Sequence, residues 1–157
     1  MATNNEAGLI RASLFDDLVR CETRLYNAVG EQLRAEHSLT TTQYELLRYF
    51  RARPRSRVAD VAAYFAAGMG AISKGVDRLQ ERGWVMRDTN PDDRRSSLVS
   101  LTADGDRVAV RAEGTYLRCL EQLLTPALGD EELAGTAAAL GCLRTYLERE
   151  RVGIPAG

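Results

Sequence analysis

Two aspartates and two arginines stand together where the chain must turn sharply, in the stretch NPDDRRSSLVSLT from Asn90 to Thr102. Asn, Pro and Asp favour a turn, and the alternating apolar residues that follow indicate a strand, so the charges are expected at the tip of a hairpin. Guanidinium groups at such a tip, from Arg94 and Arg95, match the negative potential of a narrow DNA minor groove. A neighbouring carboxylate such as Asp93 can accept hydrogen bonds from an arginine or from turn amides and so fix their direction. The alternative is an exposed charged turn without a binding partner.

A second group of polar residues falls on one face of a predicted helix over residues 69–82, MGAISKGVDRLQER. Apolar residues at helical spacing would turn inward, namely Ile72, Val76 and Leu79. On or near the opposite face are then Met69, Gly70, Ser73, Lys74, Asp77 and Arg78. A cation, a small hydroxyl and little bulk are what a helix needs for close approach to base edges in the major groove. The competing interpretation is a solvated polar face that binds nothing.

The segments before these two groups supply the helices that would hold them. Residues 9–36 have a long amphipathic pattern, with an apolar stripe near helical spacing made of Leu14, Leu18, Leu25, Val29 and Leu33. Thr40 with Gln43 three residues later predicts a capping box at the start of a second helix. Ser56 is a candidate N-cap for a short third helix, SRVADVAAYFA, and Gly83 is a candidate C-terminal cap for the helix just described. Two short helices joined by a brief turn of small residues are the outline of a helix-turn-helix.

The periodicity changes after the helix-turn-helix. Residues 84–102 have strand character on both sides of the charged turn, which predicts a hairpin. A long helix follows from residue 104 to about residue 126, with Leu117 among its apolar positions, and Asp130 opens a last helix. We therefore predict a mainly α (α+β) fold, a winged helix-turn-helix with long flanking dimerisation helices.

This order of elements predicts three parts: an N-terminal dimerisation helix in residues 1–39, a winged helix-turn-helix in residues 40–105, and C-terminal dimerisation helices in residues 106–157. The outer helices carry more apolar surface than a small central module can cover. We therefore expect them to pack on each other and on a second copy of the chain. The alternative is a monomeric helical bundle.

The distribution of charge agrees with a partner that carries phosphates. The formal net charge is −1, yet the segment from Arg48 to Arg95 holds eleven basic residues against six acidic ones. A basic middle between acidic ends is what a phosphate-binding patch looks like in a sequence, although it does not identify the partner.

Several classes of function have no support in the sequence. The three cysteines, Cys21, Cys119 and Cys142, are widely spaced without a CxxC pair, and His37 is the only histidine. A disulfide framework and a zinc site are therefore not indicated, and we predict no catalytic residues, metal or cofactor. The chain also has neither a membrane-spanning apolar stretch nor a signal pattern, so we expect a cytoplasmic protein.

Three stretches of the sequence closely resemble the MarR family of bacterial transcriptional regulators, specifically over about residues 39–105. They are LTTTQYELL on the second helix, AISKGVDRLQERGWVMR across the fourth helix and the next strand, and NPDDRRSSLVSLTADG through the hairpin. The resemblance implies a DNA-binding regulator, with repression as the expected outcome. It also implies a homodimer that binds a palindromic double-stranded operator.

The resemblance also assigns roles to single residues. Ser73, Lys74 and Arg78 would read or grip the major groove. Arg95 and Arg94 would enter the minor groove, with Asp93 as the brace of the wing. Arg55, Arg57 and Arg87 could serve phosphates, which position a protein on DNA without specifying sequence.

Members of the family commonly release DNA when a small aromatic or phenolic compound binds between the dimerisation helices and the winged region. The resemblance makes Tyr26, Tyr44, Tyr49 and Arg24 candidates for lining that crevice, while ordinary interface packing is the alternative for the tyrosines. Two other functions stay open. One is redox sensing through Cys21, and the other is a winged-helix module that binds a protein instead of DNA.

Overall fold

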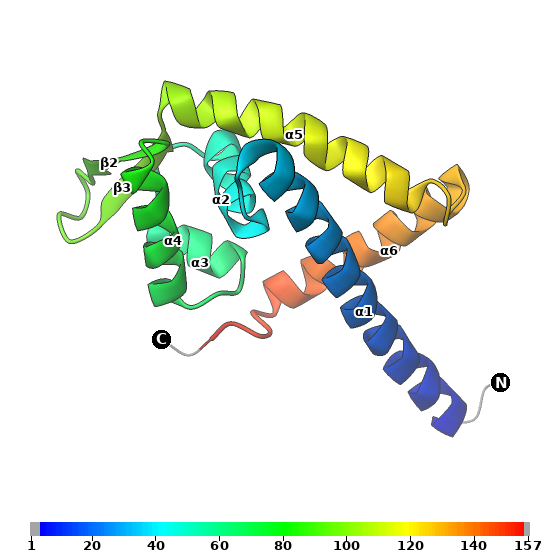
Figure 1. The fold of residues 1–157 in the computed structure, drawn as a ribbon. Coiled ribbons are helices and arrows are strands. Elements are labelled where there is room, and N and C mark those ends of the chain that lie inside the picture. The colour runs from blue at the N-terminus through cyan, green and yellow to red at the C-terminus, as the bar shows by residue number, and fades with distance from the viewer. Residues whose placement is uncertain (1–3, 156–157) are drawn as a thin grey trace.

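The first helix is the longest element of the protein, and only its C-terminal end is packed within the chain. The computed structural model describes residues 4–155, and α1 spans Asn4–His37. Figure 1 shows its N-terminal half projecting away from the remainder of the molecule. Of the apolar stripe predicted along it, Val29 and Leu33 are buried but Leu14 is exposed. The helix is therefore amphipathic as predicted, with part of its apolar face uncovered in a single chain.

The second helix begins with the capping box that the sequence predicts. α2 spans Thr41–Ala52. The amide of Gln43 donates to Thr40 Oγ1 at 3.2 Å, and the amide of Thr40 donates to Gln43 Oε1 at 3.0 Å. These two hydrogen bonds satisfy amides that the helix itself leaves unpaired, so they fix where α2 starts.

The segment before the third helix is a short strand, and here the predicted N-cap is wrong. β1 spans Ser56–Arg57 and pairs antiparallel with a later strand, with Ser56 opposite Val99. α3 spans Val58–Tyr64 with Arg57 at the N-cap position, where the Arg57 amide donates to Asp60 Oδ2 at 3.1 Å. Ser56 lies one residue before the N-cap, because its backbone pairs with a strand more than forty residues later in the chain.

The fourth helix has the predicted extent and the predicted C-terminal cap. α4 spans Met69–Glu81, and Gly83 follows it with φ of 72°, a conformation that glycine adopts without strain. The amide of Trp84 donates to Leu79 O at 3.0 Å and that of Gly83 to Gln80 O at 2.8 Å. This is the paired hydrogen-bond pattern of a Schellman motif, which ends the helix and turns the chain into the next strand.

The predicted hairpin forms the larger part of a three-stranded antiparallel sheet. β2 spans Val85–Thr89 and β3 spans Ser97–Leu101, and the strand order is β1-β3-β2. The sheet has three strands rather than the two of the predicted hairpin because β1 joins it. Since β3 lies between the other two strands, it ties the hairpin to the start of α3.

Two helices complete the chain, α5 over Ala103–Leu124 and α6 over Asp130–Arg149. Near the start of α5, Gly105 passes so close to the preceding turn that an added Cβ would lie 1.9 Å from Trp84 O, so only glycine fits there. The buried face of α5 carries small residues such as Ala112, and Leu117, predicted on the apolar face, is 57% exposed. Small side chains on this face allow α5 to pack closely against α1.

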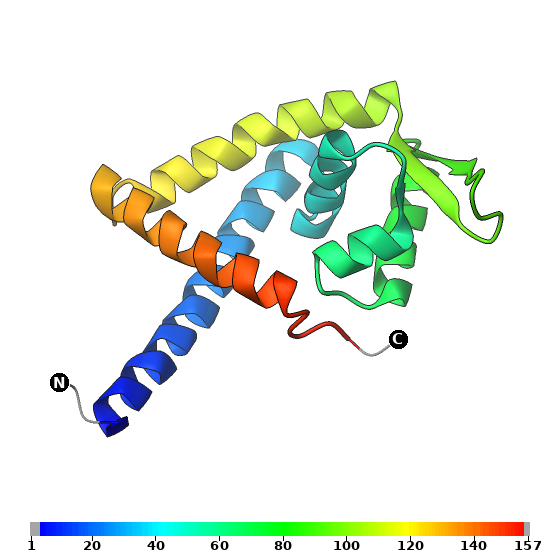
Figure 2. The ribbon, with the colours of Figure 1, turned by 180° about the vertical axis from the view of Figure 1, so that it is seen from behind.

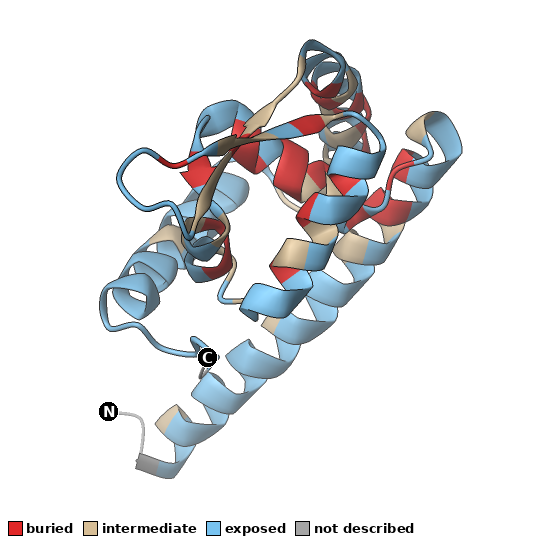
Figure 3. Cartoon of the chain, turned by 90° about the vertical axis from the view of Figure 1, so that its left-hand side faces the viewer, coloured by how far each residue is buried: buried red, intermediate tan, exposed pale blue. Residues whose placement is uncertain are grey.

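The hydrophobic core is concentrated in the winged region and at its junctions with α1 and α5. Its fully buried side chains come mainly from α2, α3, α4 and the sheet (Figure 3). α6, in contrast, has no buried residue, and its C-terminal end approaches α3 in Figure 2. A mostly helical chain with a small sheet confirms the predicted mainly α class. Within residues 4–155, none of the helices is long and apolar enough to cross a bilayer.

Candidate nucleic-acid interface

The fourth helix turns one face into the core and leaves the other open. Ile72, Val76 and Leu79 are buried, as predicted. Gly75 touches the core from the side, since an added Cβ would lie 2.9 Å from Leu46 Cδ1. A Cβ added at Gly70 would meet nothing within 4 Å, so that position is open to a ligand. The two glycines therefore have different reasons: close packing at one, and free space at the other.

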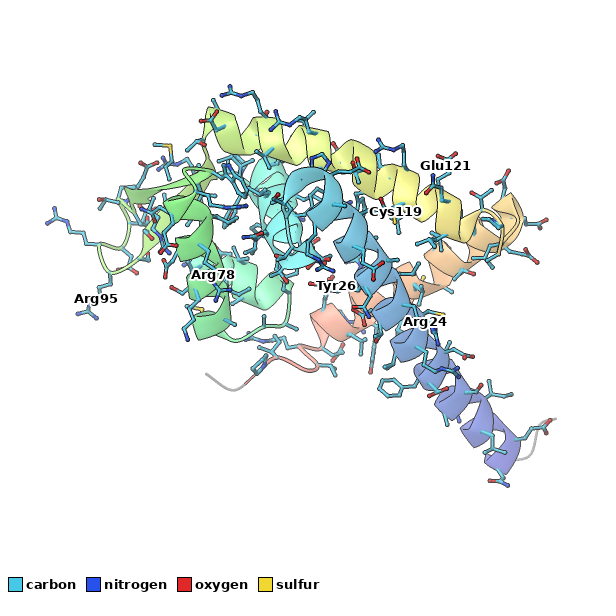
Figure 4. All side chains as sticks on the ribbon, in the orientation of Figure 1. Arg24, Tyr26, Arg78, Arg95, Cys119 and Glu121 are labelled. Atoms are coloured by element: carbon cyan, nitrogen blue, oxygen red, sulfur yellow. The ribbon has the colours of Figure 1, made fainter. Side chains whose placement is uncertain are left out.

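The cations of α4 lie on its open side. Lys74 and Arg78 are exposed, and Ser73 is half-buried beside them. Arg78 and Lys74 form no ion pair with any of the residues that the structure describes. Figure 4 shows Arg78 on the half of the molecule that also carries the hairpin. A helix whose unpaired cations face solvent can accept phosphate or base-edge contacts without first breaking an internal interaction.

The tip of the hairpin presents two further unpaired arginines. Residues 91–95 are exposed, and Arg95 projects away from the protein in Figure 4. Asp93 Oδ1 accepts a hydrogen bond from the Arg95 amide at 3.0 Å. Of the two bracing modes considered from the sequence, this is the one through a turn amide. The side chains of Arg94 and Arg95 have no acidic partner within the described part of the chain.

Asn90 holds the base of this turn and was missed by the sequence analysis. It is only 5% exposed, and its Nδ2 donates to Ser96 Oγ at 2.8 Å while its Oδ1 accepts from the Asp92 amide at 3.1 Å. The amide of Ser96 in turn donates to Asp93 O at 3.0 Å. The only sequence signal is an Asn in a turn-forming run, which does not distinguish a buried amide from an exposed one.

The three arginines predicted to serve phosphates all have internal partners. Arg57 donates from Nη2 to Asp60 Oδ1 at 2.7 Å and from Nε to Asp60 Oδ2 at 3.0 Å, and these hydrogen bonds hold the pKa of Asp60 below its ordinary value. Arg55 Nη1 lies 3.8 Å from Asp88 Oδ2. Arg87 Nη2 lies 2.5 Å from Asp77 Oδ1 on α4. These residues therefore differ from the free cations of α4 and of the turn.

The four residues predicted to line an effector crevice are not gathered around one cavity. Tyr26 Oη lies 2.8 Å from Thr42 Oγ1, and Arg24 is exposed on α1, far from Arg78 and Arg95 in Figure 4. Tyr44 is 1% exposed, and burial raises the pKa of its hydroxyl to about 12. That hydroxyl has no hydrogen-bond partner among the residues that the structure describes.

Tyr49 alone of these four lines a described cavity. The cavity measures about 280 Å³ and lies between α2 and α3, where the Arg53 guanidinium stacks over the rings of Tyr49 and Tyr64 at 5.1 and 4.7 Å. Glu45 lines the same cavity, and burial raises the pKa of its carboxyl. A larger crevice of about 1020 Å³ lies between α6 and the end of α3, and Tyr64 and Phe65 line both spaces.

The three cysteines differ in their exposure. Cys21 and Cys142 are exposed, whereas Cys119 is buried and burial raises the pKa of its thiol. Across residues 4–155, no group of three or more His, Cys, Asp or Glu side chains is arranged to hold a metal ion.

A helix-turn-helix followed by a hairpin with exposed arginines defines a winged helix-turn-helix protein. Residues 39–105 match the family model of a winged helix DNA-binding domain. The multiple antibiotic resistance protein MarR of Salmonella typhimurium is 31% identical over 96 residues, which are 61% of this chain and 67% of that protein.

Two solved structures extend the similarity to most of the chain. A cysteine-to-serine variant of MarR from Escherichia coli, complexed with operator DNA, has a TM-score of 0.76 and 25% identity and covers 83% of this chain and 93% of its own. A MarR family regulator from Streptomyces coelicolor in complex with DNA has a TM-score of 0.79 and 23% identity over 99% of this chain and 95% of its own.

The chain belongs to the MarR family of transcriptional regulators. The resemblance stated from the sequence motifs is therefore confirmed, and so is the winged helix-turn-helix fold. Because this family consists of DNA-binding regulators and not of enzymes, the prediction that the chain is not an enzyme is confirmed as well.

Proposed function

We propose that this MarR family regulator is a homodimeric repressor that binds a palindromic operator and releases it when a small aromatic or phenolic compound binds. In the proposed complex, each α4 lies in a major groove and each hairpin tip in an adjacent minor groove. The observation that carries the proposal is the set of four cations without internal partners on α4 and the hairpin tip: Lys74, Arg78, Arg94 and Arg95. An operator complex of the Escherichia coli relative, which has the same fold, supports it.

The division of labour along the chain is proposed as residues 1–39 and 106–157 for dimerisation and residues 40–105 for DNA. Apolar side chains on the outer helices support this division, since Leu9, Ile10, Phe15, Leu140 and Leu143 are all exposed in the single chain. An apolar surface of this extent is favourable only when a second surface covers it. A two-fold dimer would also repeat each DNA-reading element once per half-site.

The proposed effector site is the crevice between α6 and the end of α3. Its aromatic lining, Tyr64 and Phe65, can stack on an aromatic ring, and the adjoining cavity offers Arg53 to a phenolate or carboxylate. Because α6 belongs to the proposed dimer and α3 to the DNA-reading region, a ligand there would change the separation of the two α4 helices. Release follows if the ligand favours a separation that the operator does not accept.

The DNA-binding part is tested by fluorescence anisotropy with labelled DNA from upstream of the gene, over a series of salt concentrations. Each phosphate contact contributes about −0.9 to the slope of log K against log salt, so binding should weaken steeply as salt rises. Arg95→Ala should weaken operator binding substantially without dissociating the dimer. Arg20→Ala is the control for the loss of one positive charge, because Arg20 is exposed on α1, away from the hairpin, where it pairs with Asp16. Parent affinity in Arg95→Ala would refute the assignment of the wing.

The effector part is tested by titrating the protein–operator complex with a panel of hydroxybenzoates. The proposal expects release by at least one compound. Arg53→Gln should abolish that response, while the variant without any compound should bind DNA as tightly as the parent does. A parent protein that ignores every compound would remove the effector role, and a parent that binds no DNA would favour the protein-binding alternative.

A further inference from the structure

Arg87 is the least exposed of the arginines near the predicted DNA-facing surface. Its side chain is 24% exposed, against 57% for Arg55 and 52% for Arg57. It lies on β2 on the same side as the buried Val85, because alternate residues of a strand share a face. The guanidinium is therefore directed at α4 and away from the outer face of the sheet.

The contacts of Arg87 join the wing to the recognition helix. Arg87 Nη2 donates to Asp77 Oδ1 at 2.5 Å, and Arg87 Nε donates to Gln80 Oε1 at 3.0 Å. Asp77 and Gln80 are three residues apart, so they present neighbouring acceptors on one side of α4. Two donors from one rigid guanidinium to two acceptors on a helix define an orientation as well as a distance.

Asp77 is otherwise a poor choice on a helix that meets DNA. Its carboxylate is 55% exposed and lies within one turn of Lys74 and Arg78. A free carboxylate there would repel phosphates and lower affinity. Pairing with Arg87 neutralises it, and the pair then connects the element proposed to enter the major groove with the strand that carries the minor-groove tip.

We infer that Asp77 and Arg87 are positioning residues, which fix the wing against α4 so that both elements engage their grooves on the same operator half-site. The inference rests on the proposed function. It changes the role of Arg87, which the sequence analysis assigned to phosphate contact. It also predicts that removing the Asp77 carboxylate weakens operator binding, whereas the loss of a negative charge alone would strengthen it.

The chain provides a matched control for that sign. Glu81 lies one turn after Asp77 on α4, is exposed, and forms no ion pair with any of the described residues. Removing either carboxylate makes the protein more positive by the same amount. If charge alone mattered, Asp77→Ala and Glu81→Ala would both bind DNA more tightly.

The experiment measures binding of the parent, Asp77→Ala and Glu81→Ala to the operator and to a scrambled duplex of the same length. The expected result is an operator affinity roughly tenfold lower for Asp77→Ala, as for a residue coupled to its contact partner. Binding of the scrambled duplex should stay equal or become tighter for both variants. Operator binding by Asp77→Ala that equals or exceeds that of the parent would overturn the inference.

Two further variants separate positioning from other roles. Asp77→Asn keeps an acceptor for Arg87 and should return to within about threefold of parent operator affinity. The double variant Asp77→Ala with Arg87→Ala should bind the operator no more weakly than Arg87→Ala alone, because the two residues act through one contact. Asp77→Asn as weak as Asp77→Ala, or additive losses in the double variant, would contradict the pair.

A phosphate contact by Arg87 would give a different result. Arg87→Ala would then weaken operator and scrambled duplex equally and reduce the salt slope by about one unit. Melting temperatures of all variants establish that the fold is retained, and Arg87→Lys, which keeps the charge without the fork, gives a second test if Arg87→Ala is unstable. A parent protein without specific DNA binding would refute the proposed function itself. If the parent binds the operator and Asp77→Ala binds it with equal affinity, only the positioning pair is refuted.

Discussion

The winged region and the C-terminal helix of this regulator differ sharply in how they use their apolar residues. Side chains such as Leu47, Val61 and Val76 in the winged region are fully buried, whereas α6 buries none of its residues. The winged region can therefore support its own fold with contacts inside one chain. In α6, Leu140, Leu143 and Leu147 remain 37–40% exposed, because within one chain they line the open crevice beside α3.

The same contrast holds for the charged residues. Arg57 and Arg87 in the winged region are held by acidic partners, while Arg95 at the tip has none among the described residues. An internally paired arginine must give up its partner before it can bind phosphate, and a free arginine need not. Paired arginines therefore contribute to contacts within the chain, whereas unpaired arginines remain available to bind another molecule.

The largest expected effect comes from disrupting the exposed face of α6. Leu140→Glu with Leu143→Glu places charges at two positions that are 40% and 39% exposed, so the single chain should stay folded by circular dichroism. Sedimentation should show a monomer, and operator affinity should fall about 100- to 10,000-fold because the two half-sites are no longer bound together. A dimer that persists in this variant would contradict the comparison.

A matched pair of leucines separates the two regions by stability. Leu47→Ala removes a fully buried side chain and should lower the free energy of unfolding by about 2–5 kcal/mol at every protein concentration. Leu147→Ala should lower stability only where dimer forms, so its effect should depend on concentration. Chemical denaturation at two protein concentrations measures both. A concentration-independent loss in Leu147→Ala would mean that α6 packs within the chain.

Asn90→Ala sharpens the comparison within the winged region. The change removes the buried amide at the base of the wing turn and leaves Arg95 and the core untouched. Operator affinity should fall about three- to tenfold, equivalent to one hydrogen bond of about 1 kcal/mol, because the tip loses its fixed direction. Anisotropy titration gives the affinity. Asn90→Asp, which keeps the acceptor for the Asp92 amide, should lose less operator affinity. Parent affinity in Asn90→Ala would show that the tip needs no support from this amide.

The smallest expected effect is a pH dependence at the start of α3. The hydrogen bonds from Arg57 hold the pKa of Asp60 below its ordinary value, so this carboxylate stabilises the folded state. That contribution is fully present above the ordinary aspartate pKa and is lost as pH falls through the lowered pKa of the folded state. The difference in melting temperature between the parent and Asp60→Asn should therefore shrink as pH falls. A difference that grows toward acid pH would contradict the assignment.

Features set by neighbouring residues could be predicted from the sequence. The capping box of Thr40 and Gln43, the glycine that ends α4 and the buried stripe of Ile72, Val76 and Leu79 were all found in the structure. Each depends on residues within a turn or two of helix, and the chain needs no distant partner to define them.

Features that depend on distant residues were missed. The pairing of Ser56 with Val99 turned a predicted N-cap into a strand, and the burial of Asn90 has no local signal. The positions of the predicted effector residues within the single chain also had no local signal, since Tyr44 lies in the core while Tyr49 borders a cavity. Helical spacing shows that a tyrosine faces inward, but it does not show what it meets there.

By itself, the sequence determined which segments are helices, which two strands form the hairpin, where most of these elements end, and which cations lie on α4 and on the turn of this MarR family regulator. Only the tertiary structure decided which of those cations are free, because an arginine is paired or unpaired according to the acid that folding brings beside it. Local hydrogen bonds and periodicity act between near neighbours in the chain, whereas the partner of Arg87 comes from a different element and depends on the packing of the whole winged region.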